Sequence, residues 1–145
     1  MENIKEQARL KFYGVDIVDV NFNIQKKRDD NLKVAIDIKP KVFYPKNSAK
    51  QFKIIMATTL VADGYFHLNL TSIGSFELNK IIDEKMKQDF ININAPAIMF
   101  PYVRAFIATL TTNLGSSIGS ITIPPHFFPK HLEEVNQNTT NLELL

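Results

Sequence analysis

The first half of the chain alternates hydrophobic and polar residues with the period of two that β-strands require. The alternation is clearest over 10–24, where it changes frame across Gly14 and again near Ile17. Frame changes of this kind indicate a bulge or a bend, so this stretch predicts one long, irregular strand. A second strand is predicted over 32–38, and Pro40 is expected to end it or to place it at a sheet edge.

Two further strands follow, joined by a tight Asp-Gly reversal. The third is predicted over 51–62 and the fourth over 65–71. Ser75 is then a candidate N-cap for a helix that begins at residue 76 or 77 and ends near residue 89.

The longest helix is predicted over 94–115. Asn94 is expected to cap its first turn, Pro96 fits near its start, and Gly115 follows its last turn. Pro101 lies in the interior, where it would remove one hydrogen bond and kink the axis. The apolar stripe is too wide for a sheet alone to cover, which predicts a subunit interface on this helix.

After this helix, a Gly/Ser-rich hinge at 116–120 precedes a Pro-Pro pair, and a short helix is expected around 130–135. Four strands followed by helices indicate an α+β fold with an antiparallel sheet covered on one side. The chain is expected to form a single domain over residues 1–145, with 1–8 and 137–145 as disordered tails.

Three segments of the second half resemble the signature of the SecB family of protein-export chaperones. They are the run Ile-Met-Phe-Pro-Tyr-Val-Arg from Ile98 to Arg104, the helix that continues to Gly115, and the segment 121–128. The resemblance implies a four-stranded antiparallel sheet with a crossover connection, a long helix packed on it and a short C-terminal lid helix. It also implies a homotetramer built as a dimer of dimers, with the long helices between the sheets.

The sequence offers no motif for catalysis or metal binding. It contains no cysteine, and its three histidines lack the spacing of metal ligands on one helix. No carboxylate pair is placed for acid–base work, and neither a nucleophile motif nor a phosphate-binding loop occurs. We therefore expect a protein that is not an enzyme and that holds no cofactor and no metal.

The charge and hydropathy of the chain exclude other classes of partner. A net charge of +2 is too small to indicate nucleic acid, and the lysines scattered over 39–53 read as a solvated loop rim. The N-terminus lacks the layout of a secretory signal, and no run of residues is long enough to cross a bilayer. We expect a cytoplasmic protein that does not insert into a membrane.

Several hydrophobic residues occupy positions where a small soluble domain would not need them. Phe43 and Tyr44 lie in a loop bracketed by prolines, Phe127 and Phe128 follow the hinge, and Leu132 lies on the expected short helix. Core packing would explain each one alone, but together they resemble the walls of an adjustable hydrophobic groove. The SecB resemblance implies that such a groove binds unfolded precursors. It nominates these lining residues: Phe43, Tyr44, Met99, Phe106, Phe127, Phe128 and Leu132.

The same resemblance implies the surfaces used for assembly and for docking. Subunit contacts would involve the first strand, the long helix and an exposed face of the fourth strand. The residues nominated are Val18, Val20, Phe22, Phe66, Leu68, Leu70, Tyr102, Val103 and Leu110. Contacts with the secretory ATPase would fall on Asp19, Asn23, His67 and Asn69. Only the first of these four is acidic, whereas the family has an acidic face there, which predicts weaker attraction of a basic partner.

The leading hypothesis is an ATP-independent holdase that binds unfolded polypeptides in hydrophobic grooves and delivers them for export. One alternative is a SecB-like chaperone dedicated to one client, for example an antitoxin. A second alternative, from another class, is a small α+β protein or enzyme that binds an apolar ligand. A long open groove would favour a chaperone, whereas one deep pocket with convergent polar groups would favour the ligand-binding protein.

Overall fold

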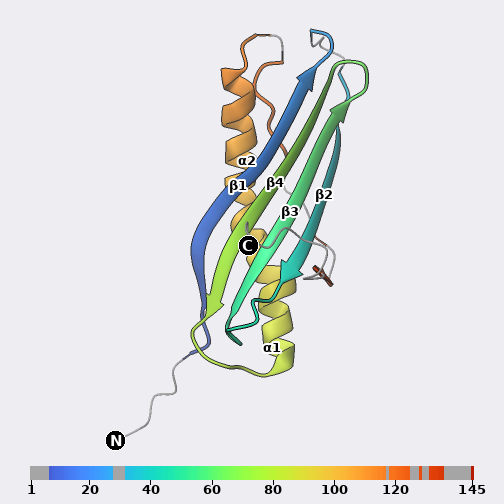
Figure 1. Ribbon diagram of the computed structural model, residues 1–145. Helices are drawn as coiled ribbons and strands as arrows, with labels where there is room; N and C mark the ends of the chain where they lie inside the picture. Colours follow the sequence, from blue (N-terminus) through green and yellow to red (C-terminus); the bar gives the residue numbers. More distant parts are fainter. Residues whose placement is uncertain (1–6, 28–31, 117, 125–127, 129–130, 136–144) are drawn as a thin grey trace, which may run out of the picture.

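A single twisted sheet forms one layer of the molecule, and a long helix lies along one face of it (Figure 1). The computed structural model describes residues 7–27, 32–116, 118–124, 128, 131–135 and 145. In chain order the elements are β1 (Leu10–Ile24), β2 (Ala35–Phe43), β3 (Gln51–Ala62), β4 (Phe66–Leu78), α1 (Glu84–Asp89), the π-helical turn η1 (Phe90–Asn94), α2 (Ala95–Asn113) and β5 (Glu133–Glu134).

The order of strands across the sheet is β1-β4-β3-β2-β5. The first two strands flank the β3–β4 hairpin on opposite sides, so the chain crosses over between them. Neighbouring strands are antiparallel except β2 and β5, which are parallel. The predicted α+β class is confirmed, but among the described residues the sheet has five strands rather than four and is mixed rather than antiparallel.

Strand β1 has the predicted bounds and the predicted irregularities. Its register against β4 shifts between Phe12 and Val15 and again between Ile17 and Asp19. Gly14 lies within the first shift at a φ of +110°, a conformation that favours glycine. The frame changes of the alternation therefore do mark bulges.

The face of the sheet under α2 forms the core. Side chains of β4 alternate, and those on the helix side are almost completely buried. The expectation that Phe66, Leu68 and Leu70 lie on an exposed face is wrong, because all three belong to this buried set. At Gly74 the helix approaches so closely that an added Cβ would lie 3.0 Å from the Met99 sulfur.

Strand β2 begins later than predicted and continues through Pro40 to Phe43. The Val42 carbonyl accepts a 2.8 Å hydrogen bond from the Val135 N–H, on the side of β5. Backbone groups of every second residue point to the same side of a strand, so position 40 faces β5 as position 42 does. Because Pro40 lacks its N–H on that side, it removes no hydrogen bond to β3. The proline does place the strand near a sheet edge, as predicted, but it does not end it.

Strand β4 continues to Leu78, and the helix predicted from residue 76 or 77 begins only at Glu84. Ser75 is not an N-cap, because it pairs with Lys53 in the sheet. The phenyl ring of Phe76 stacks on that of Phe52 with centroids 5.3 Å apart, which keeps this stretch in the core as a strand. The cap is Asp83, whose carboxylate accepts a 2.9 Å hydrogen bond from the Met86 N–H.

Helices α1 and α2 form one continuous helix, joined by η1, so the predicted break before residue 94 is absent. Asn94 has helical dihedral angles and its side chain makes no capping hydrogen bond. Instead, the Ala95 N–H donates to the carbonyl of Phe90, five residues earlier, as in a π-turn. Pro101 lies inside α2 at an exposed position.

The continuous helix Glu84–Asn113 has 30 residues and, by length and composition alone, could cross a membrane. This corrects the expectation that no run is long enough. Its Met99, Val103 and Ile107 stripe is fully buried against the sheet, as in the core helix of a globular domain. Outside this stripe, however, Ile93 and Tyr102 of this helix are 59% and 56% exposed.

The chain after α2 reverses and packs back along the helix. Gly115 has a φ of +98°, and the Ile121 N–H donates a 2.9 Å hydrogen bond to the buried hydroxyl of Thr111. Ile118, Ile121 and Ile123 all enter the core. We call the described residues of 118–135 the return segment. Its last part is strand β5, so the predicted helix at 130–135 is wrong at 133–134, where the backbone pairs with the edge of β2.

Candidate functional site

The predicted groove residues that the structure describes come from the end of β2, the helix and the return segment, and the chain itself buries several of them. Met99 is completely buried, and Leu132 is only 3% exposed. Phe43 is also buried, at 7% exposure, and strand alternation after Val42 turns it away from α2. Phe127 lies outside the described residues, and Phe106 packs half-buried against the core.

Tyr44 is the aromatic residue of this group that remains half-buried at the end of β2. Its ring lies against helix α1, with the Lys87 ammonium 5.2 Å from the ring centroid. Burial raises the pKa of the Tyr44 hydroxyl above its ordinary value of 10.0, although a hydrogen bond with the Gln88 side chain lowers it. The hydroxyl is therefore neutral at physiological pH and acts as a polar contact within an apolar wall.

Phe128 forms a second aromatic wall on the return segment. It is half-buried, and its ring meets that of Phe100 edge-on at a centroid distance of 5.4 Å. Edge-on pairs of this kind favour a defined side-chain position over a fluid contact. Phe100, which sequence reasoning did not single out, is therefore the helix residue that positions this wall.

Two amide side chains that sequence reasoning missed join Tyr44 and Leu132 to the helix. Asn92, buried in η1, accepts a 2.9 Å hydrogen bond from the Leu132 N–H and donates a 3.1 Å hydrogen bond to Gln88. Gln88 also contacts the Tyr44 hydroxyl. A polar residue between Ile91 and Ile93 was a signal in the sequence, but only the π-turn brings both Ile91 and Asn92 to the buried side.

A hollow of about 310 Å³ lies beside the edge of β2, next to the point where β5 pairs with it. A 3.7 Å ion pair between Lys41 and Glu133 lies at its rim. Its lining residues are Ile38, Lys39, Pro40, Lys41, His131 and Glu133. None of the predicted aromatic residues that the structure describes lines this hollow, so it is not the groove that the sequence predicts.

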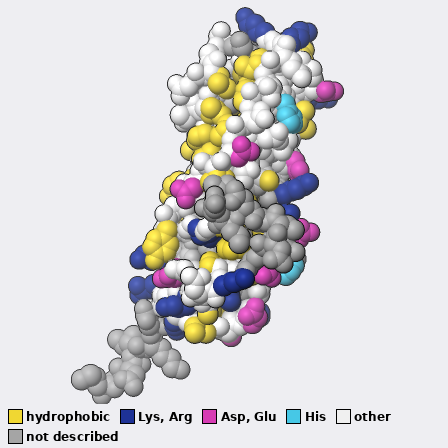
Figure 2. All heavy atoms as spheres, viewed as in Figure 1, with side chains coloured by type: hydrophobic (Ala, Val, Ile, Leu, Met, Phe, Trp, Pro, Cys, Tyr) yellow, Lys and Arg dark blue, Asp and Glu magenta, His cyan; other side chains and the backbone are white. Residues whose placement is uncertain are grey.

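An uncovered apolar surface runs along β1 and the neighbouring side of α2. The Tyr102 ring packs against Phe12 at 5.2 Å yet remains 56% exposed, and Val20 and Ile24 on the edge strand are 42% and 44% exposed. Figure 2 shows hydrophobic side chains gathered over the upper part of these elements. We call this the β1–α2 surface, made of Val20, Phe22, Ile24, Tyr102, Phe106 and Leu110. Of the other predicted interface residues, Val103 is buried within the chain and Val18 is half-buried.

Polar side chains of β1, β3 and β4 gather on the face of the sheet opposite α2. Asn23 lies opposite His67 in the register of β1 and β4, and the Asn69 amide nitrogen is 3.4 Å from His67 Nδ1. Thr59 donates a 3.1 Å hydrogen bond to the Asn69 carbonyl oxygen. The sheet thus brings together three of the four residues predicted to contact the ATPase. Asp19, beyond the second bulge, supplies the one carboxylate of the four.

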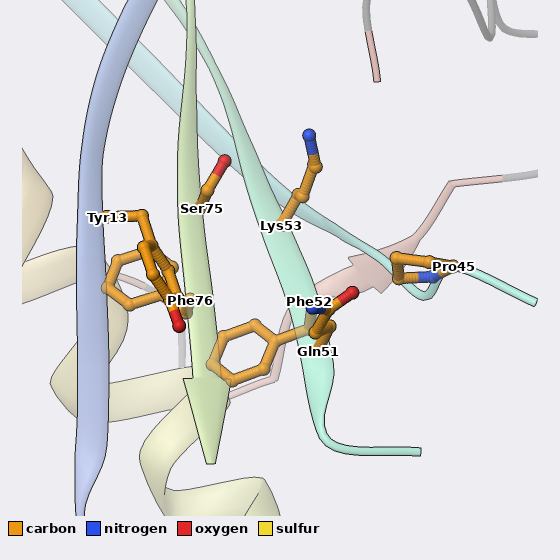
Figure 3. A pocket seen from close by; sticks show the side chains of 7 residues that line it. All are labelled: Tyr13, Pro45, Gln51, Phe52, Lys53, Ser75 and Phe76. Atoms are coloured by element: carbon orange, nitrogen blue, oxygen red, sulfur yellow. The ribbon is translucent and has the colours of Figure 1, made fainter. Parts of the chain in front are cut away.

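The lower end of this open face holds a shallow hollow of about 360 Å³ (Figure 3). Tyr13 donates a 3.4 Å hydrogen bond and Gln51 a 2.9 Å hydrogen bond to the Glu77 carboxylate beside it. The lining residues are Tyr13, Pro45, Gln51, Phe52, Lys53, Ser75 and Phe76. Within the described part of the chain, no three His, Cys, Asp or Glu side chains come together as metal ligands would.

Comparison with known proteins identifies the family. A model of the family described as preprotein translocase subunit SecB matches residues 16–136. An uncharacterised protein of Methanocaldococcus jannaschii is 30% identical over 144 residues, which cover 92% of this chain and 91% of that protein. A solved structure of the Mycobacterium tuberculosis SecB-like chaperone Rv1957, in complex with a ChAD peptide from the Rv1956 HigA1 antitoxin, shares the fold. Its TM-score is 0.65 and its identity 13%, with 80% of this chain and 91% of that chain covered. The chain therefore belongs to the SecB family and is a divergent, non-enzymatic, SecB-like chaperone.

Proposed function

We propose that this chaperone is an ATP-independent holdase that binds unfolded polypeptides between the end of β2, the helix and the return segment. The observation that carries the proposal is the match to the SecB family over most of the chain. The half-buried aromatic rings of Tyr44 and Phe128 support it, because both leave part of their apolar surface uncovered. Binding would be driven by burial of apolar surface on the client and would need no covalent step.

The proposed assembly is a homotetramer, a dimer of dimers. The β1–α2 surface supports it, because an exposed edge strand and an outward-facing apolar helix are features that soluble monomers rarely leave uncovered. The proposed location is the cytoplasm, where unfolded clients are met after synthesis.

A holdase could serve either of two roles, general export or the protection of one dedicated client. Export through the secretory ATPase would use the open face of the sheet at Asp19, Asn23, His67 and Asn69. Since only one of these residues is acidic, attraction of a basic partner there would be weak. A dedicated client is therefore the second candidate. The mycobacterial structural relative, which holds an antitoxin peptide, supports it by analogy.

The test is suppression of aggregation without nucleotide. A chemically unfolded client is diluted into buffer with increasing amounts of the purified protein, and light scattering is recorded. Suppression near one client per assembly is the expected result. Undiminished scattering in the presence of folded protein would refute a general holdase and leave only the dedicated client.

A further inference from the structure

Asn92 is a buried amide in η1, between Ile91 and Ile93. It is 7% exposed, and η1 turns it inward together with Ile91. Both ends of its amide are used, since Oδ1 accepts from the Leu132 N–H and Nδ2 donates to Gln88 Oε1. The first of these hydrogen bonds joins residues 40 positions apart in sequence. Asn92 therefore fixes the return segment to the helix just before β5 begins.

Gln88 extends this connection to the loop after β2. Its Nε2 donates a 2.8 Å hydrogen bond to Glu84, and its side chain also makes a hydrogen bond with the Tyr44 hydroxyl. Glu84, Gln88 and Asn92 follow one another at intervals of four, so they lie along one side of the helix. Three segments far apart in sequence thus meet through two neutral amides.

We infer that Gln88 and Asn92 are positioning residues for the client site, a role that rests on the proposed function. They hold Tyr44, just after β2, and Leu132, just before β5, at fixed places relative to one helix. A buried N–H that loses its acceptor is unfavourable, so loss of the Asn92 amide would release Leu132 from the helix. The site would widen, and clients would meet a less ordered surface.

Strand β5 makes this arrangement sensitive to Asn92. It comprises two residues, both exposed, and pairs with β2 only at Lys41 and Val42. Pro40 lacks the N–H that could continue the parallel ladder in the other direction. Leu132, buried at 3% exposure and bound to Asn92, is therefore the principal anchor of this end of the return segment.

The test compares Asn92→Leu with the control Asn113→Leu in the full-length chain. Asn113 is also a helix asparagine whose amide donates a hydrogen bond, to the carbonyl of Thr109, but it is exposed and far from Leu132. Hydrogen exchange of the Leu132 amide reports on the anchor. Anisotropy of labelled, reduced and carboxymethylated α-lactalbumin, which is permanently unfolded, reports on client binding.

For Asn92→Leu we expect faster hydrogen exchange at the Leu132 amide and a rise in the client Kd on the order of tenfold. The control Asn113→Leu should change neither quantity. Faster exchange with an unchanged Kd would overturn the inference and leave the holdase standing. Unchanged exchange would overturn the anchor itself. Wild-type protein that does not bind this client would refute a general holdase instead, and with it the inference for such clients.

Two further variants keep the inference testable if Asn92→Leu does not fold. Asn92→Asp retains the acceptor for the Leu132 N–H, so hydrogen exchange at that amide should stay slow, in contrast to Asn92→Leu. Gln88→Leu leaves the Asn92 acceptor in place but removes the contact with Tyr44, so client affinity should fall while Leu132 stays protected. Loss of protection in Gln88→Leu would contradict the separate roles of the two amides.

Discussion

Replacing Gly74 with alanine tests how α2 packs on the sheet. A Cβ at this position would lie 3.0 Å from the Met99 sulfur and 3.0 Å from Phe76 Cε2. The Phe76 ring is held between Phe12 and Phe52, at centroid distances of 5.2 and 5.3 Å, so it cannot easily turn away. Met99 is flexible but completely buried. The methyl group must therefore displace the helix or force Met99 into a poorer rotamer.

The magnitude follows from two opposing effects. Overpacking of a well-filled core costs about 1–3 kcal/mol. Replacing glycine by alanine at a compatible backbone recovers about 0.4–1 kcal/mol from the unfolded state. We expect Gly74→Ala to lower the free energy of unfolding by roughly 1–2 kcal/mol, as measured by urea denaturation at fixed protein concentration. Ser75→Ala, on the opposite face of the sheet, should change it by less than about 0.5 kcal/mol.

A double substitution separates overpacking from other effects. Met99→Ala alone should cost about 2–5 kcal/mol, because it leaves a cavity under β4. The added methyl group at position 74 would fill part of that cavity, so the double variant should be less destabilised than the sum of the two single variants. A Gly74→Ala variant as stable as the wild type, or strict additivity with Met99→Ala, would refute the helix–sheet contact described here.

Three other predictions follow from the same structure. Tyr102→Lys should reduce the molar mass of the assembly, measured by light scattering after gel filtration. The control Ile81→Lys, at an exposed position on the connection before α1, should not. Equal masses for both variants would argue against the β1–α2 surface as an interface. Thr111→Val removes the acceptor for the Ile121 N–H and should lower the free energy of unfolding, measured by urea denaturation, by about 1–3 kcal/mol. An unchanged free energy would mean that the return segment does not depend on this hydrogen bond. Because burial raises the pKa of Tyr44 in the folded state, its contribution to stability is complete below about pH 10 and is lost as the pH rises through the raised value. Tyr44→Phe should remove this part of the alkaline loss in unfolding experiments at increasing pH, and an unchanged profile would contradict the assignment.

The strands were predictable where the alternation is local and uninterrupted. The bounds of β1 and β3 agree with the structure, and both bulges of β1 were visible as frame changes. The stretch after Thr71 was not readable in this way. Ser75 is a typical N-cap residue, yet stacking of Phe76 on Phe52, from a strand more than twenty residues earlier, keeps it in the sheet. Tertiary packing here overrides a local capping signal.

The wall-forming residues were predictable by type but not by placement. Aromatic residues bracketed by prolines pointed to Tyr44 and Phe128, but not to Gln88, which contacts Tyr44, or to Asn92, which holds Leu132. Asn92 faces inward only because η1 inserts an extra residue into the turn, and no pattern in the sequence announces a π-turn. Strand β5 could not be predicted either, because two glutamates show no alternation and pair with an edge that the fold creates.

The central claim is that unfolded polypeptide binds between the end of β2 and the return segment. The most direct measurement is site-specific photocrosslinking without nucleotide. A photoreactive amino acid replaces Tyr44, Phe128 or, as a control on the open face of the sheet, Thr71. We predict that reduced, carboxymethylated α-lactalbumin is captured at the first two positions and not at the third, and that the native, folded protein is captured at none. Equal capture at all three positions, or no capture of the unfolded client, would contradict the account.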